Sequence, residues 1–160
     1  MNYEDLMTNA IALANQAFLN EEVPVGALIV DESGKILGEG FNQREKLKDP
    51  LSHAELNAIS DARKKLNDWR FDELTIFVTL EPCAMCAGAI IQSRFKRLIF
   101  GAWDEKAGAV GSVWDLVRDP RALSKIEVIS GVKEKDCSRD RKSTRLNSSH
   151  SQQSRMPSSA

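Results

Sequence analysis

The chain has 160 residues, of which 42% are hydrophobic, and its formal net charge is −1. This length suits one ordinary domain with one hydrophobic core. No apolar run approaches the roughly 20 residues of a membrane-spanning helix, and residues 1–5 are acidic where a secretory signal is basic. We therefore expect a cytoplasmic protein with no membrane segment. Three cysteines are too few for a disulfide framework.

The charge is distributed unevenly along the chain. Residues 138–160 hold five basic side chains and one acid, Asp140, for a net charge of +4. The remainder has 17 basic and 22 acidic side chains, and its net charge is therefore −5. An acidic body argues against a protein that binds nucleic acid over its whole surface, but it leaves room for a basic patch near a site.

Hydrophobic spacing predicts the elements of the first half in chain order. Residues 5–19 carry apolar side chains three and four apart, as in an amphipathic helix. The apolar runs 25–30 and 36–42 flank a polar turn and predict an antiparallel hairpin. Residues 53–66 form a second helix with a basic C-terminus. The β-branched run 74–80 predicts a central strand buried on both faces.

Strands and helices alternate in the second half. We expect a helix at 84–92, a strand at 97–101, a short helix at 113–117 and a strand at 126–129. Such alternation implies right-handed crossovers and parallel strands, with the N-terminal hairpin as the antiparallel edge. The predicted fold is a three-layer α/β/α sandwich around a five-stranded mixed sheet.

The C-terminal segment differs in composition from the rest. Residues 138–160 contain eight serines, four arginines and no aromatic side chain. Such a segment buries too little apolar surface to offset the entropy lost on ordering. We therefore expect one domain over residues 1–137, followed by a disordered tail.

Cys83 and Cys86 are the first candidates for chemistry. They follow a predicted buried strand and begin a helix, where free backbone N–H groups and the positive helix end favour thiolates. The pair is compatible with a metal site, a redox disulfide or two buried structural cysteines. The last is the weakest alternative, because this spacing directs both sulfurs to one point.

The second candidate is the segment that contains His53 and Glu55. His53 is the only histidine before residue 138, and a lone histidine is by default a core or loop residue. Glu55 also fits a helix capping box with Ser52. Residues two apart on a helix point to nearly opposite sides, so only a helix start lets Glu55 reach a site shared with His53.

Together, the segment with His53 and Glu55 and the cysteine pair favour a catalytic metal site. His-x-Glu at 53–55, followed by Pro-Cys-x-x-Cys at 82–86, is the signature of zinc nucleobase deaminases. Structural zinc sites are closed by four protein ligands, whereas His53, Cys83 and Cys86 are three and leave a position for water. The other cysteine, Cys137, borders the predicted tail.

Longer blocks carry a closer resemblance. The sequence resembles the cytidine-deaminase-like superfamily and, more closely, the bacterial tRNA-specific adenosine deaminase family, from about residue 5 to residue 137. The zinc motif alone is shared with cytosine, guanine and deoxycytidylate deaminases. The blocks that favour the tRNA enzymes are residues 22–27, 38–42, 79–90 and 101–106, with Gly111 and Ser112.

The resemblance implies an activity and a cofactor. The substrate would be the wobble adenosine of a tRNA anticodon stem-loop, splayed into a pocket and converted to inosine. One Zn²⁺ per chain, on His53, Cys83 and Cys86, would supply the hydroxide that attacks C6 of adenine. Glu55 would take the proton of the water, deliver it to the ring nitrogen and then assist the departure of ammonia.

The resemblance also implies substrate contacts. Val25 would form an apolar wall, Asn42 would contact the base edge, and the backbone of Ala54 would add a polar contact. Asp104 and Lys106 would meet flanking nucleotides. A turn-capping role is the second interpretation of Asn42, and ordinary solvated loop charges explain Asp104 and Lys106 equally well.

Partners and alternatives follow from the same resemblance. Members of the family are usually homodimers, and we expect Trp69 and Trp114 to be core or interface aromatics, with Trp114 a candidate for the dimer contact. The alternatives are a deaminase of free bases or nucleosides, a thiol redox protein using the cysteine pair, and a non-catalytic binding subunit.

The C-terminus departs from the family pattern. The family continues after the position of Cys137 with a helix that bears paired aromatics and a terminal basic residue, and residues 138–160 have neither feature. Residues 142–149 resemble translated cloning adapter rather than evolved sequence. We expect that the native C-terminus is lost and that RNA affinity is weakened more than the zinc site.

Overall fold

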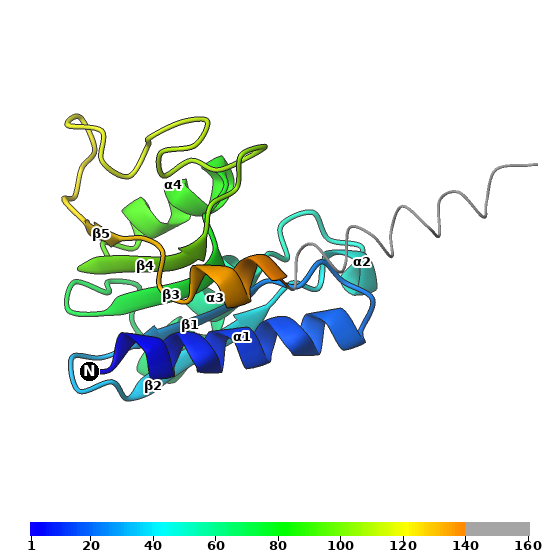
Figure 1. The fold of residues 1–160 in the computed structure, drawn as a ribbon. Helices are drawn as coiled ribbons and strands as arrows, with labels where there is room; N and C mark the ends of the chain where they lie inside the picture. Colours follow the sequence, from blue (N-terminus) through cyan, green and yellow to red (C-terminus); the bar gives the residue numbers. More distant parts are fainter. Residues whose placement is uncertain (140–160) are drawn as a thin grey trace, which may run out of the picture.

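The computed structural model describes residues 1–139, in which helices pack on both faces of one sheet (Figure 1). The elements are α1 (Tyr3–Leu19), β1 (Gly26–Val30), β2 (Ile36–Phe41), α2 (Arg44–Leu47), α3 (Ala54–Leu66), β3 (Thr75–Leu80), α4 (Ala84–Gln92), β4 (Arg97–Ala102) and β5 (Glu127–Ile129). Residues 134–139 are also helical.

The sheet has the order β2-β1-β3-β4-β5. β3, β4 and β5 are parallel, whereas β1 is antiparallel to both of its neighbours. The predicted hairpin, the parallel half of the sheet and the central position of the strand at 74–80 are therefore confirmed. β3 lies in the middle of the sheet, and all of its residues except the last are buried.

Helices cover both faces of the sheet and form two apolar clusters. On one face Ala58 of α3 and Ile90 of α4 pack in the same cluster as Ile76 of β3. On the other face Met7 of α1 packs in a cluster with Phe77 of β3. Successive strand residues point to opposite faces, so β3 contributes to both clusters. The predicted three-layer α/β/α sandwich is confirmed.

Close packing of β2 on α3 fixes the start of that helix. A Cβ atom on Gly40 would collide with the carbonyl oxygen of Ala54 and the backbone nitrogen of Ala58. Only glycine allows the strand and the helix to approach this closely. The first turn of α3 is thus held against the sheet, and the residues next to it acquire a defined position.

The structure differs from the predicted elements in two loops. The four-residue helix α2 was not expected, and the short helix expected at 113–117 is absent. The chain there turns back on itself instead: the Gly111 N–H donates to the Trp114 carbonyl at 2.8 Å, and the Leu116 N–H donates to that of Ala109 at 2.9 Å. These bonds within the loop replace the helical ones.

The two tryptophans are not core residues. Trp69 is 55% exposed and Trp114 is 53% exposed, so the core interpretation of both was wrong. The interface interpretation stays a prediction. Within residues 1–139, every helix is too short or too polar to cross a bilayer.

The helix at 134–139 overlaps the predicted tail. Cys137 is buried in the same cluster as Met7 and Phe77, on the face that α1 covers. Ser138 and Arg139, the first two residues of the predicted tail, belong to this helix. The rest of the predicted disordered tail lies outside the described residues.

Candidate metal centre and active site

Three potential metal ligands converge at the starts of two helices. His53 immediately precedes α3, Cys83 immediately precedes α4, and Cys86 lies in the first turn of α4. The His53 Nδ1 atom is 3.7 Å from Cys83 Sγ and 3.5 Å from Cys86 Sγ. All three ligand atoms lie within 4.8 Å of one another.

This spacing fits a tetrahedral zinc ion. Zinc bonds of about 2.3 Å to sulfur and about 2.0 Å to nitrogen, at the tetrahedral angle, place the nitrogen about 3.6 Å from each sulfur. Among residues 1–139, no fourth His, Cys, Asp or Glu joins this group. Cys137 lies in the core on the face of the sheet that α1 covers. The described residues thus offer three ligands at this site, which is the pattern of catalytic zinc sites.

The pKa values of the two cysteines shift in opposite directions. A hydrogen bond from Cys86, helped by His53, lowers the pKa of Cys83 to about 4. The same bond, together with burial, raises the pKa of Cys86. The hydrogen bond to Cys83 also raises the pKa of His53. The lowered thiol pKa expected for both cysteines at this helix start therefore applies to Cys83 and not to Cys86, and its main cause is the neighbouring cysteine.

Glu55 is buried in the first turn of α3, with 4% of its surface exposed. The capping-box alternative is wrong, because α3 has His53 rather than Ser52 at its N-cap and the Ser52 N–H donates to Asp49 O at 3.2 Å. His53 has an extended backbone (φ −80°, ψ 154°). The helical rule that separates residues two apart does not hold there, so His53 and Glu55 face one site. Burial raises the pKa of Glu55.

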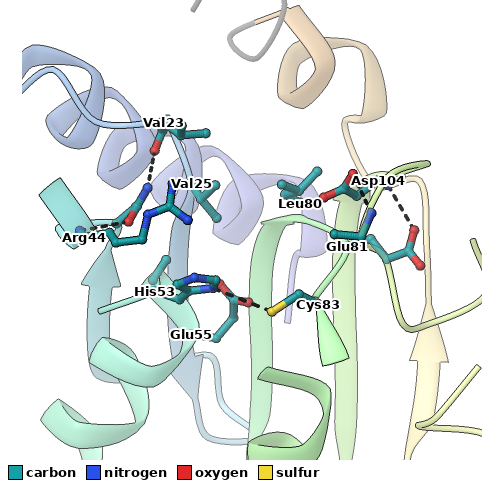
Figure 2. A pocket seen from close by; sticks show the side chains of 12 residues that line it. Val23, Val25, Arg44, His53, Glu55, Leu80, Glu81, Cys83 and Asp104 are labelled. Atoms are coloured by element: carbon teal, nitrogen blue, oxygen red, sulfur yellow. Dashed lines mark hydrogen bonds between the residues drawn. The ribbon is translucent and has the colours of Figure 1, made fainter. Parts of the chain in front are cut away.

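A pocket of about 260 Å³ at one edge of the sheet is lined by His53, Glu55 and Cys83. The parallel strands β3 and β4 end at this edge and the antiparallel β1 begins there, so loops from both halves of the chain meet. Ligands of open α/β sheets bind at such an edge. Figure 2 shows His53, Glu55 and Cys83 between two walls, one with Val23, Val25 and Arg44, the other with Leu80, Glu81 and Asp104.

Four of the five predicted substrate contacts line the pocket, namely Val25, Asn42, Ala54 and Asp104. Lys106 is exposed on the loop after β4 and is not among the lining residues. Its backbone N–H donates to the Asp104 carboxylate at 3.1 Å. The contact of Lys106 with a nucleotide remains a prediction.

The Asn42 side chain holds its own loop together. Its amide nitrogen donates to the Val23 carbonyl at 3.1 Å, and its amide oxygen accepts a hydrogen bond from the Arg44 backbone at 3.1 Å. The turn-capping role of Asn42 is confirmed, and its contact with a base remains a prediction.

Several lining residues were missed from the sequence. They are Val23, Arg44, Leu80, Glu81 and Ala107. Arg44 lies in α2, a helix with no sequence signal. Glu81 stands directly before the predicted zinc motif, and an acid at the end of a buried strand was the available signal.

Two buried carboxylates hold the loops of the two walls. Glu22 and Glu81 are each 2% exposed. Glu22 accepts backbone N–H bonds from Glu45 at 3.1 Å and Lys46 at 2.7 Å, which fixes α2. Glu81 accepts backbone N–H bonds from the loop after β4, including one from Asp104 at 3.0 Å, and so fixes that loop.

A mixed five-stranded sheet with a His-Cys-Cys group and a buried glutamate beside it defines a deaminase. A family model of MafB19-like deaminases matches residues 1–140. A tRNA-specific adenosine deaminase of Haemophilus influenzae is 45% identical over 135 residues, which cover 84% of this chain and 78% of the relative. Its counterpart in Bacillus subtilis is 42% identical over 131 residues, covering 82% and 81% respectively.

A solved structure agrees with these relatives. It comes from a study of A-to-I editing by tRNA:A34 deaminases, superposes with a TM-score of 0.81 at 35% identity, and covers 85% of this chain and 98% of its own. The chain belongs to the tRNA-specific adenosine deaminase family. The thiol redox alternative is therefore wrong.

Proposed function

We propose that this protein converts the wobble adenosine of a tRNA anticodon to inosine, using one Zn²⁺ held by His53, Cys83 and Cys86. The convergence of these three ligand atoms beside the buried carboxylate of Glu55 carries the proposal. The substrate class is supported by relatives of 42–45% identity that are named for it and that match the chain over more than four fifths of its length.

The chemistry is a hydrolysis in which Glu55 moves the proton. When bound, Zn²⁺ lowers the pKa of a coordinated water to about 7 and so supplies the nucleophile for C6 of adenine. Glu55 would accept one proton of the water and deliver it to the adjacent ring nitrogen, and would then pass the remaining hydroxyl proton to the amino group, which leaves as ammonia. Burial raises the pKa of Glu55, which makes its carboxylate a stronger base than an exposed glutamate.

The rest of the pocket binds and orients the base. A base splayed out of the anticodon loop enters between the two walls. Val25 contacts its apolar face, while the Asn42 side chain and the backbone of Ala54 contact its polar edge. Asp104 and Lys106 meet flanking nucleotides. Arg44 is exposed at the same pocket, so its cation meets a phosphate of a polynucleotide but has no such partner on a free base.

The partners and location follow from this substrate. The anticodon stem-loop is the part of tRNA that the pocket contacts, and the cytoplasm is where we expect the enzyme to meet it. We further propose a homodimer. The adjacent, exposed Val113 and Trp114 support an apolar contact with a second copy.

Turnover of defined substrates tests the proposal. The purified full chain, loaded with Zn²⁺, is incubated with an anticodon stem-loop that carries wobble adenosine and, separately, with free adenosine, guanine and cytosine. We expect inosine in the stem-loop and negligible product from the free compounds. Turnover of a free base without turnover of the stem-loop would establish the free-base alternative instead.

A further inference from the structure

Glu81 is a buried acid beside the metal ligands, and the proposed chemistry does not use it. It follows β3 and precedes Cys83 by two residues, and only 2% of its surface is exposed. An ionised carboxylate this deep in a protein is stable only when hydrogen bonds replace its lost hydration. The loop after β4 supplies those bonds.

Both oxygens of Glu81 accept hydrogen bonds from this loop. Oε1 accepts from the Asp104 N–H at 3.0 Å and from the Ser112 hydroxyl. Oε2 accepts from the backbone N–H groups of Val110 at 3.0 Å and Ser112 at 3.1 Å. Four donors, spread over residues 104–112, thus meet one side chain.

The loop also packs closely around this carboxylate. A Cβ atom on Gly108 would collide with the Glu81 carboxyl group, so the loop approaches it with bare backbone. The Ala109 N–H donates to the Pro82 carbonyl at 2.8 Å, and Gly108 forms a β-bridge with Cys83. The loop is therefore attached to the segment that carries the metal ligand.

These contacts determine one wall of the pocket. Asp104 and Ala107, both in the loop, line the pocket. Asp104 lies opposite Val25 and Arg44 (Figure 2). Asp104 is held directly by Glu81 through its backbone. Glu81 precedes Cys83 by two residues. The position of this wall relative to Cys83 thus depends on the Glu81 side chain.

We propose that Glu81 is a positioning residue whose carboxylate keeps residues 104–112 in the conformation that binds substrate. If the loop is ordered in only a fraction of the molecules, the apparent affinity for substrate falls to that fraction of its intrinsic value. Because the ordering cost falls equally on the bound substrate and on the transition state, KM rises while kcat changes little. The proposal rests on the proposed function, since the substrate that meets this wall is the splayed adenosine.

The variant Glu81→Gln tests the role. One amide oxygen cannot replace two carboxylate oxygens, and the amide NH₂ group faces N–H donors. We expect unchanged zinc content, faster hydrogen exchange at the Val110 and Ser112 amides, and a KM for the stem-loop that is about tenfold higher with kcat within about threefold.

Two further variants make the test specific. Ser112→Ala removes only the hydroxyl donor and should raise KM by about threefold in the same direction. Glu105→Gln changes an exposed carboxylate in the same loop and should leave KM, kcat and hydrogen exchange as in the wild type.

Several outcomes would overturn the proposal. One is a Glu81→Gln protein with wild-type KM and loop protection. A second is a fall in kcat with unchanged KM, which would place Glu81 in the chemistry. A third is loss of zinc or of folding in Glu81→Gln together with a wild-type KM in Ser112→Ala. Wild-type protein that does not turn over the stem-loop would contradict the proposed function alone, because the exchange rates still report on the loop.

Discussion

Two parts of the pocket depend on the sequence in different ways. They are the metal corner, formed by His53, Cys83 and Cys86 with Glu55, and the loop wall, formed by residues 104–112. His53, Cys83 and Cys86 lie at the first residues of α3 and α4, so short motifs place each of them. The wall formed by residues 104–112 is held by Glu81, which lies 23 to 31 residues away along the chain. The ligands are thus recognisable from short motifs although His53 lies 30 residues from Cys83, whereas no short motif marks the contacts that shape the loop wall.

The largest effect should come from the metal corner, through Glu55→Gln. The amide is nearly isosteric with the carboxylate but cannot accept the proton of the water. We expect the zinc content of the wild type and a deamination rate lower by about 10²–10⁴-fold, the usual contribution of a positioned acid–base group. Metal analysis and single-turnover rates on the stem-loop measure both quantities.

The matched control for this variant is Glu45→Gln, an exposed acid of α2 whose side chain is outside the pocket lining. It should deaminate at the wild-type rate. If Glu55→Gln kept its activity while binding zinc, the carboxylate would have a structural role. The metal corner would then not carry the proton transfer, and its contrast with the loop wall would not hold.

A smaller effect should come from the walls, through Arg44→Ala. Loss of one phosphate contact should raise KM for the stem-loop about threefold to tenfold and reduce the salt dependence of binding by about one unit of slope. Any slow turnover of free adenosine should not change. Lys46→Ala, in the same short helix but outside the pocket lining, is the control.

This comparison sharpens the substrate assignment. An equal loss on the stem-loop and on free adenosine would mean that Arg44 supports the pocket rather than binds the backbone of RNA. A loss confined to the stem-loop would place the phosphate path along α2.

The sequence predicted the elements that local patterns encode. Apolar and β-branched runs were sufficient for the hairpin and for β3, and the spacing of Cys83 and Cys86 was sufficient to predict that their sulfurs point to one site. It left Glu55 ambiguous between a capping box and a catalytic base, because the outcome depends on whether Ser52 or His53 is the N-cap of α3. That start is fixed by the packing of Gly40 against α3, which is a tertiary contact.

Other features could not be predicted for the same physical reason. α2 depends on the buried carboxylate of Glu22, and its intrinsic helix tendency over four residues is negligible. The helix expected at 113–117 is replaced by backbone bonds such as Leu116 N–H to Ala109 O, a contact that the local apolar pattern does not encode. The segment around Trp114 shows that an apolar pattern alone does not distinguish a buried side chain from an exposed one.

The coordination of the metal tests the central claim most directly. Zinc-edge X-ray absorption of the purified protein, combined with metal analysis, measures the number and kind of ligand atoms. We expect about one zinc per chain with two sulfur neighbours at about 2.3 Å and two nitrogen or oxygen neighbours at about 2.0 Å, unchanged in Cys137→Ser. A third sulfur neighbour that disappears in Cys137→Ser, or a zinc-free protein with a disulfide between Cys83 and Cys86, would contradict the account.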